Sequence, residues 1–325
     1  MTPAPGGLRD AQGRTIAYLR ISLTDRCNLR CSYCSPAEHE VPSHLLTRAE
    51  VARLAAVFGG LGVRRVRLTG GEPTLRGDLL GIVEDLRGAP GIEEVALTTN
   101  GQRLAALAAP LAAAGLGALN VSLDTLDAGR LLRISGPGAR LDEILAGLDA
   151  AAGAGFPHLK VNAVVMGGVN EDELGALVRH AWERGASPRF IELMPFGDGV
   201  PVPVARMKRL LADQGIRLVP DGKRGWGPAH YMREEGGSRH VGFIGALTEN
   251  FCDACNRARV AADGGFQACL GGDDRFNLRD RMRAGATDAD LAAVVREALG
   301  QKAPRHHMDD AGSRLVLLPM MGIGG

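Results

Sequence analysis

Short runs rich in β-branched residues alternate with longer helical patterns between residues 17 and 193. Repeated strand–helix–strand units place their strands side by side in parallel and their helices on the outside, so the repeat predicts an α/β fold. A closed barrel of this kind has eight units, and the sequence supplies six; we therefore expect a partial (βα)6 TIM-type barrel. The predicted strands are 17–23, 65–68, 94–98, 118–122, 158–165 and 189–193, and the predicted helices are 47–58, 78–86, 104–114, 141–152 and 171–184.

Local signals refine this organisation. Thr47, with Glu50 three residues later, predicts a capping box at the start of the first helix. Pro110 predicts a kink or a break in the third helix. The polar, glycine-rich segment 222–237 is expected to be a loop. We expect residues 1–200 to form the partial barrel and residues 201–325 an irregular α+β extension that covers the barrel mouth.

Six cysteines fall into two groups of three. Cys27, Cys31 and Cys34 share one short loop, and Cys252, Cys255 and Cys269 form the second group. Closed zinc sites and closed cubane iron–sulfur clusters take four protein ligands. Three thiolates therefore predict a cluster with one iron open to another molecule. Buried core cysteines, disulfides, or zinc sites completed by a distant histidine are the alternatives.

The lack of targeting signals argues against disulfides, and the net charge bears on the kind of partner. Residues 1–8 lack the basic start and long apolar run of a secretory signal, and no uninterrupted apolar stretch near 18 residues predicts a membrane span. We therefore expect a cytoplasmic protein, in which thiols stay reduced and clustered cysteines bind metal or act in catalysis. The net charge of +1 excludes a global basic field for nucleic acid.

Polar and glycine-rich motifs follow the predicted strands one after another. In barrels of this class the C-terminal ends of the strands carry the chemistry. The first cysteine loop follows the first strand, and Met194 and Pro195 follow the sixth. The intervening motifs are Thr69-Gly70-Gly71-Glu72-Pro73, Thr98-Thr99-Asn100-Gly101 and Ser122-Leu123-Asp124. This series predicts a rim that binds a cofactor.

Strand parity gathers basic residues on one face of the predicted sheet. Arg65 and Arg67 alternate with apolar residues, as do Arg20 and Lys160 on their own strands. Buried cations are costly unless they are paired. Internal salt bridges with Glu72, Asp124 or Glu192 are one explanation. A polyanionic substrate is the explanation we favour, since several cations converge and guanidinium forks suit phosphate oxygens. Arg257 and Arg259, which share parity beside the second triad, favour a substrate role there too.

These motifs together resemble those of a known family. The markers are Tyr18-Leu19-Arg20-Ile21-Ser22, the first cysteine loop with Tyr33 before its last cysteine, residues 67–73, 98–101, 120–124 and 189–192, the Cys-Asn-Arg-x-Arg motif at 255–259, and the terminal Gly324-Gly325. From about Arg14 to its end the chain resembles the GTP 3′,8-cyclases, radical S-adenosylmethionine (SAM) enzymes of the first step of molybdenum cofactor biosynthesis. The first cysteine loop alone indicates only the superfamily.

The resemblance implies a role for each matching residue. It implies two [4Fe-4S] clusters, held by Cys27, Cys31 and Cys34 and by Cys252, Cys255 and Cys269. It implies SAM contacts for Tyr33, Gly71, Glu72, Ser122 and Met194. It implies GTP contacts for Arg20, Arg65, Arg67, Thr98, Lys160, Arg189, Arg257 and Arg259. Arg257, Arg259, Gly324 and Gly325 are the implied catalytic residues, with the Gly-Gly tail reaching into the active site.

The implied reaction begins with one-electron cleavage of SAM to a 5′-deoxyadenosyl radical. That radical takes the C3′ hydrogen of GTP, and C3′ then bonds to C8 to give 3′,8-cyclo-7,8-dihydro-GTP. The implied partners are GTP, an electron donor such as a flavodoxin, the downstream cyclic pyranopterin monophosphate synthase, and a second copy in a homodimer. Two alternatives stay open: a peptide-modifying radical SAM enzyme with an auxiliary cluster, and a non-enzymatic scaffold with two zinc sites.

Overall fold

One open sheet organises the chain. The structure is a computed structural model that describes residues 7–34, 45–196, 198–224, 227–272, 276–306 and 308. Six strands at the centre of the sheet lie in chain order, and each pair of neighbours is parallel. They are β1 (Tyr18–Ser22), β2 (Arg65–Thr69), β3 (Glu94–Thr99), β4 (Ala118–Ser122), β5 (His158–Val165) and β6 (Ser187–Glu192). The predicted partial barrel is confirmed, because no pairing within the described ranges joins β1 to β6.

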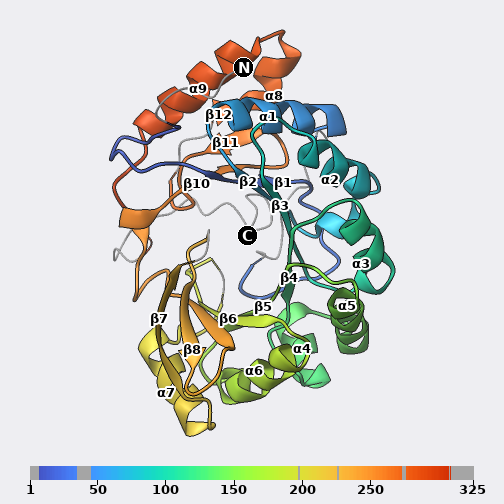
Figure 1. Ribbon diagram of the computed structural model, residues 1–325, viewed down its shortest axis with the longest axis vertical. Helices are drawn as coiled ribbons and strands as arrows, with labels where there is room; N and C mark the ends of the chain where they lie inside the picture. Colours follow the sequence, from blue (N-terminus) through green and yellow to red (C-terminus); the bar gives the residue numbers. More distant parts are fainter. Residues whose placement is uncertain are drawn as a thin grey trace.

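Helices follow the strands and form an arc outside the sheet (Figure 1). They are α1 (Arg48–Gly60), α2 (Leu79–Arg87), α3 (Leu104–Ala113), α4 (Ala128–Ser135), α5 (Leu141–Gly153) and α6 (Leu174–Glu183), with 3-10 turns at η1 (Pro73–Leu75) and η2 (Glu171–Glu173). The capping box at Thr47 and Glu50 is confirmed. Within the described part of the chain, no helix is long and apolar enough to span a membrane.

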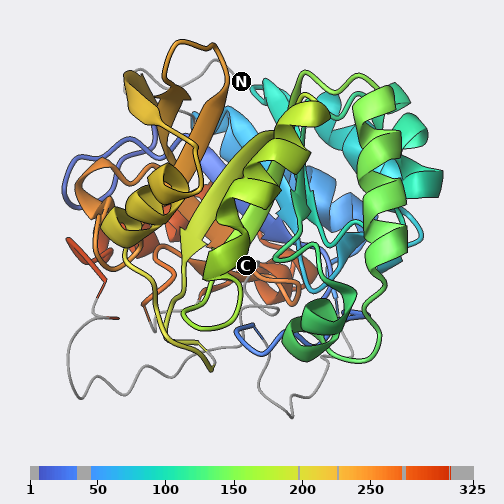
Figure 2. The ribbon, with the colours of Figure 1, turned by 90° about the horizontal axis from the view of Figure 1, so that it is seen from below.

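Segments from the last third of the chain extend both edges of the sheet. Next to β1 lie β10 (Arg257–Val260), β11 (Gly265–Gln267) and β12 (Phe276–Asn277); next to β6 lie β9 (His240–Ile244), β8 (His230–Glu234) and β7 (Leu218–Arg224). The remaining elements are α7 (Val204–Asp213), η3 (Cys252–Ala254), α8 (Leu278–Arg283) and α9 (Asp288–Gly300). In Figure 2 the yellow-to-orange elements around β7–β9 lie on one side and the green helices on the other.

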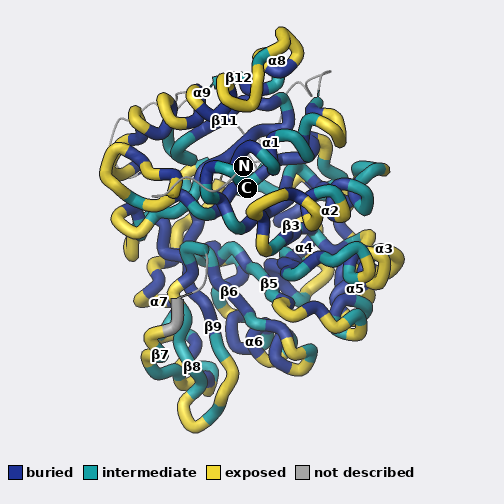
Figure 3. Tube along the Cα trace, turned by 45° about the horizontal axis from the view of Figure 1, so that its top comes forward, coloured by how far each residue is buried: buried dark blue, intermediate teal, exposed yellow. Residues whose placement is uncertain are grey.

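Strand alternation separates the core from the concave face. Leu19, Ile21, Val66 and Leu68 are fully buried in one apolar cluster with the inner faces of the helices. Figure 3 shows this burial as dark strands at the centre and exposed outer helix turns. Residues of the opposite parity, among them Arg20 and those described below, face away from that cluster, as period-two alternation requires. The expected division into an apolar and a basic face is confirmed.

Two local expectations differ from the structure, and one helix was not expected. The break expected at Pro110 does not occur: the third helix continues to Ala113, since Leu104, Ala108 and Leu111 bury one face of it. Residues 222–237 are not one continuous loop, because the end of β7 and all of β8 lie in this range and pair as an antiparallel hairpin. The helix α4 was not expected; its N-cap Asp127 accepts a hydrogen bond from the Arg130 N–H, a short-range signal that was available in the sequence.

Gly101 allows a close approach that no other residue would allow. Its φ is +86°, and a Cβ there would lie 2.9 Å from Val121 Cγ1. Gly153, the last residue of α5, has no positive φ, and a Cβ added there would meet no atom within 4 Å.

We predict opposite effects of alanine at these two glycines. Gly101→Ala should lower the free energy of unfolding by about 1–3 kcal/mol, through left-handed strain and overlap. Gly153→Ala should raise it by about 0.4–1 kcal/mol, since alanine restricts the unfolded chain and suits a helix. Thermal unfolding of both variants under anaerobic conditions measures the two shifts. Shifts of the same sign would contradict the structural explanation.

Candidate active site

A cavity of about 270 Å³ lies at the C-terminal ends of the six parallel strands. Its wall includes the first cysteine loop, the ends of β2 to β6, and residues of the C-terminal part such as Tyr231, Phe251 and Leu270. Segments from both halves of the chain therefore meet around a single space on the concave face of the sheet.

Cys27, Cys31 and Cys34 all line this cavity, and all are free thiols. The loop is compact, because the Cys34 N–H donates to the Cys31 carbonyl at 3.0 Å. Burial raises the pKa of Cys27 to about 11 and that of Cys31 to about 12. Nearby Glu72 and Asp124 act in the same direction. Thiols in this setting ionise when a metal replaces their protons.

The donor set suits a cluster better than a single ion. Within the described ranges, no three His, Cys, Asp or Glu side chains are gathered closely enough to hold one metal ion. A cubane cluster needs a wider arrangement, because each thiolate binds a different iron. Cys27, Cys31 and Cys34, on one loop at the cavity wall, fit that requirement and would hold such a cluster at the cavity.

Gly71 and Glu72 join the loop after β2 to the cysteine loop. A Cβ at Gly71 would lie 2.3 Å from the Arg26 carbonyl oxygen, so only glycine fits there. The Gly71 N–H donates to the Thr24 carbonyl at 2.6 Å and the Glu72 N–H to the Arg26 carbonyl at 2.8 Å. These bonds fix the cysteine loop against the end of β2.

The Glu72 carboxylate is buried and joins the loop after β2 to the end of β3. It accepts from the Thr74 hydroxyl at 2.6 Å, the Thr99 hydroxyl at 2.7 Å and the Asn100 N–H at 2.7 Å. Burial raises its pKa, and these bonds oppose the rise. The resemblance implies that Glu72 contacts SAM. It does not predict that both carboxylate oxygens accept hydrogen bonds from the protein.

Asp124 is the second buried carboxylate at the rim. It accepts from the Tyr33 hydroxyl at 2.7 Å and from the Val164 N–H at 2.8 Å. Burial raises the pKa of Asp124 to about 6, against the opposing effect of these bonds. The contact orients Tyr33 of the cysteine loop in the cavity wall, which also includes Ser122 and Met194, two further predicted SAM-contacting residues.

Two rows of cations cross the sheet in the wall of the cavity. The strand register aligns Arg259, Arg20 and Arg67 in one row. It aligns Arg257 and Arg65 on either side of Tyr18 in the next row. All of these side chains line the cavity, together with Thr98, Lys160 and Arg189. The structure thus brings together every residue that the sequence predicts to contact GTP.

The alternative explanation, salt bridges from the arginines to Glu72, Asp124 or Glu192, is not found within the described part of the chain. Glu192 is fully buried, and one of its oxygens accepts from the N–H groups of Leu247 and Thr248 at 2.8 and 2.9 Å. Glu72 and Asp124 are held by the donors named above, so none of these three described carboxylates pairs with a described arginine. Glu94 does pair with Arg65, at 2.5 Å.

Arg67 and Arg189 donate to neutral acceptors among the described residues. Arg67 donates to the Tyr18 hydroxyl and to Thr98 Oγ1, the latter at 3.1 Å. Arg189 donates to Asn162 Oδ1 at 2.6 and 2.9 Å. Neutral acceptors orient a guanidinium but leave its charge uncompensated.

The positive charge of the arginines shifts the pKa values of neighbouring titratable groups. Burial, followed by the charges of Arg189, Arg65 and Arg67, lowers the pKa of Lys160 to about 7. Burial favours the neutral form of Tyr18, but the charges of Arg67, Arg20 and Arg65 outweigh it and lower the Tyr18 pKa to about 8. A polyanion bound in this cavity would relieve the repulsion among these cations.

The second triad lies beside the cavity instead of in its wall. Phe251, Arg257, Arg259 and Leu270 line the space, while Cys252, Cys255 and Cys269 do not. Arg257 stacks over the Phe251 ring, 4.6 Å from its centroid. Burial opposes ionisation of Cys255, but Arg257 and Lys302 outweigh it and lower its pKa to about 7.

Two predicted residues, Gly324 and Gly325, lie outside the described residues. Several residues that line the cavity had no predicted role, among them Tyr18, Asn162 and Tyr231. Parity with Arg20 could have indicated Tyr18. Tyr231 carries no such signal, because it reaches the cavity from a hairpin paired to the far edge of the sheet. The individual roles of all these residues stay predictions.

Comparisons with known proteins agree with this geometry. The Radical SAM superfamily model matches residues 21–181, and the Molybdenum Cofactor Synthesis C model matches residues 186–308. SuiB of Streptococcus suis, solved with bound S-adenosylmethionine, shares the fold, with a TM-score of 0.62 at 18% identity over 86% of this chain and 68% of that one.

Curated relatives match over almost the whole chain. A protein of Heliobacterium modesticaldum named GTP 3′,8-cyclase is 43% identical over 93% of this chain and 95% of its own length. A protein of Pseudomonas aeruginosa named GTP 3′,8-cyclase 1 is 42% identical over 97% of this chain and 98% of its own length. The chain therefore belongs to the radical SAM superfamily, in the family whose curated members are named GTP 3′,8-cyclase.

Proposed function

We propose that this chain catalyses the GTP 3′,8-cyclase reaction of molybdenum cofactor biosynthesis. The observation that carries the proposal is the pairing, in one cavity, of a three-cysteine loop with two rows of cations. The cysteine loop can hold a cluster with an open iron, and the cations suit a triphosphate. A peptide substrate would not require this concentration of positive charge.

The cofactors would supply the difficult chemistry. The cluster and SAM, when bound, supply one-electron cleavage of SAM to the 5′-deoxyadenosyl radical that takes the C3′ hydrogen of GTP. This chain's own residues bind, orient and shield the reactants. Arg20, Arg65, Arg67, Lys160 and Arg189 would hold the triphosphate and so place the ribose at a fixed distance from the first cysteine loop.

Residues of the cysteine loop and of the strand ends would form the SAM-binding part of the cavity. Tyr33, Gly71, Ser122 and Met194 would contact SAM, with Glu72 supporting the loops around it. Tyr33 is already oriented by Asp124, so this part of the wall is formed before a ligand binds.

The base end of GTP would lie toward the second triad. Cys252, Cys255 and Cys269 would hold a second [4Fe-4S] cluster, which would supply an open iron for the guanine. Arg257 and Arg259 come directly after that loop and line the cavity, so they would bridge the second cluster and the substrate. Gly324 and Gly325 would complete the site, with the reactive nucleotide between the two clusters.

Further parts of the proposal concern the cellular setting. We propose a cytoplasmic homodimer that receives electrons from a donor such as a flavodoxin. Its product would pass to cyclic pyranopterin monophosphate synthase, because a dihydro-nucleotide made by radical chemistry is a biosynthetic intermediate.

The central experiment is an anaerobic turnover assay. The protein reconstituted with iron and sulfide, given reductant and SAM, should form 5′-deoxyadenosine together with a cyclised isomer of GTP only when GTP is present. Mass spectrometry measures both products. Equal 5′-deoxyadenosine with and without GTP, and no cyclised nucleotide, would point to another substrate of a radical SAM enzyme.

Removal of one cation should weaken GTP binding. Arg257→Ala should raise the Kd for GTP about tenfold to a hundredfold, because a charged hydrogen-bond donor is lost. Isothermal calorimetry measures the Kd, and iron and sulfide contents check that the clusters persist. Arg206→Ala, at a 52% exposed arginine of α7, is the control. An unchanged Kd in Arg257→Ala with intact clusters would remove Arg257 from the substrate site.

The contribution of Lys160 should depend on pH. With a pKa of about 7 in the free protein, Lys160 is charged below that pH and increasingly neutral above it. Only the charged form attracts phosphate, so the ratio of Kd values for Lys160→Met and the unchanged protein should be largest near pH 6 and approach one near about pH 9. The same ratio at all pH values would show that Lys160 does not titrate next to GTP.

A further inference from the structure

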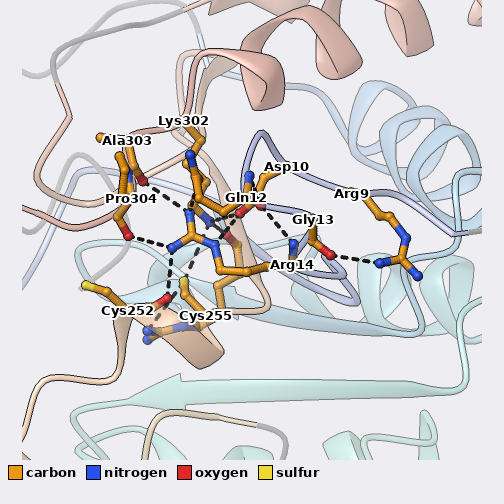
Figure 4. A network of polar contacts seen from close by, with 11 residues as sticks. Arg9, Asp10, Gln12, Gly13, Arg14, Cys252, Cys255, Lys302, Ala303 and Pro304 are labelled. Carbon is orange, nitrogen blue, oxygen red and sulfur yellow. Dashed lines mark hydrogen bonds and ion pairs between the residues drawn. The ribbon is translucent and has the colours of Figure 1, made fainter.

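Three charged residues from the two ends of the chain meet directly behind the second triad (Figure 4). Asp10 and Arg14 belong to the segment before β1, and Lys302 follows α9. Asp10 is 7% exposed and Lys302 is 4% exposed. Burial of three charged side chains at one place is costly unless their partners are well placed.

Arg14 ties this group to the triad loop. Its Nη1 donates to the Cys252 carbonyl at 2.8 Å and to the Pro304 carbonyl at 2.7 Å. Its Nη2 donates to the Ala303 carbonyl at 3.1 Å, and its Nε donates to Asp10 Oδ2 at 2.6 Å. One guanidinium therefore holds the N-terminal segment, the segment after α9 and the second cysteine loop together.

Lys302 contacts a ligand sulfur itself. Its Nζ donates to Cys255 Sγ at 3.6 Å and to the Arg257 carbonyl at 2.9 Å. Asp10 Oδ2 lies 3.8 Å from the same Nζ, on the side of the N-terminal segment. The Lys302 ammonium is thus held by the Arg257 carbonyl and the Asp10 carboxylate while it donates to the thiol.

Counted over the described residues named above, the charges of this group do not cancel. Asp10 supplies one negative charge against the positive charges of Arg14 and Lys302, and Arg257 Nη2 adds a third cation 3.9 Å from Cys255 Sγ. An uncompensated positive charge in a buried place is stabilised by a nearby anion. The thiolates of the second triad are anions that these cations would stabilise.

We propose that Lys302, oriented by Asp10, is a positioning residue that holds the Cys255 thiolate and raises the reduction potential of the cluster on the second triad. The inference rests on the second cluster of the proposed function. Reduction adds one negative charge to a cluster, so a fixed cation beside a ligand sulfur favours the reduced state. Hydrogen bonds to the ligand sulfurs act in the same direction.

The first triad offers a contrast within the same chain. Cys31 Sγ contacts the neutral Ser135 hydroxyl at 3.4 Å, and the charged groups that act on Cys27 and Cys31 are the carboxylates of Glu72 and Asp124. The same charge argument therefore predicts that the cluster on the second triad has the higher reduction potential of the two.

The test isolates the second cluster in the full chain. A Cys27→Ala, Cys31→Ala, Cys34→Ala variant keeps only the second triad; its iron and sulfide contents show whether a cluster forms there. An EPR-monitored redox titration then compares this background with the same background carrying Lys302→Met, which keeps the apolar stem and removes the charge. Lys208→Met, at a lysine of α7 paired with Glu249, is the control.

We expect Lys302→Met to retain its iron and sulfide. Its equilibrium constant for one-electron reduction should fall about tenfold, which corresponds to a potential about 59 mV lower. Lys302→Arg should restore most of the potential, because the charge returns, whereas Lys208→Met should leave it unchanged. A purely structural role would move cluster content or thermal stability without this dependence on charge.

Three results would overturn the inference. Two of them concern Lys302 alone, and the third also concerns the second cluster of the proposed function. A full cluster with an unchanged potential in Lys302→Met removes the role of Lys302 and leaves the proposed function intact. If Lys302→Met cannot hold a cluster, Lys302→Gln replaces it, and an unchanged potential there has the same meaning. A triple-cysteine variant that forms no cluster even with Lys302 present removes the second cluster itself and, with it, that part of the proposed function.

Discussion

Convergence of positive charge on the concave face of an open parallel sheet is the constraint that the site depends on. Parallel strands flanked by helices must bury one set of alternate side chains, and Leu19, Ile21, Val66 and Leu68 fill that role. The other set points to the concave face, where the open sheet leaves room for a cavity. Strand register brings the arginines at these positions into rows, and an anion in the cavity would lower the repulsion among them.

Buried carboxylates near the cavity serve the scaffold and are not counter-ions to the arginines. Glu72 joins the loops after β2 and β3, Asp124 orients Tyr33, and Glu192 holds the backbone of Leu247 and Thr248. Each carboxylate accepts hydrogen bonds from hydroxyl or backbone N–H groups. These bonds satisfy its oxygens without pairing it with an arginine. Hydrogen bonds thereby tie the rim beside the first cysteine loop, and the basic face lies next to it.

The two cysteine triads lie in opposite electrostatic surroundings. Carboxylates and apolar burial surround the first, and the pKa values of Cys27 and Cys31 are raised. Cations lie near Cys255 of the second and lower its pKa to about 7, whereas burial raises the pKa of Cys252. The two groups of three cysteines thus differ in the charges that lie near them.

The sequence by itself determined the six parallel strands with five intervening helices, the capping box at Thr47, and the face on which each strand carries its cations, because all of these follow from local periodicity and short-range capping. It predicted an interruption at Pro110 and a loop at 222–237 wrongly, since tertiary packing and strand pairing outweigh local propensity. Only the tertiary structure decided that β10 aligns Arg257 and Arg259 with Arg20 and Arg67, and that Asp10, Arg14 and Lys302 meet behind Cys255. Those contacts join residues more than 200 positions apart, and no local pattern encodes a pairing across such a distance.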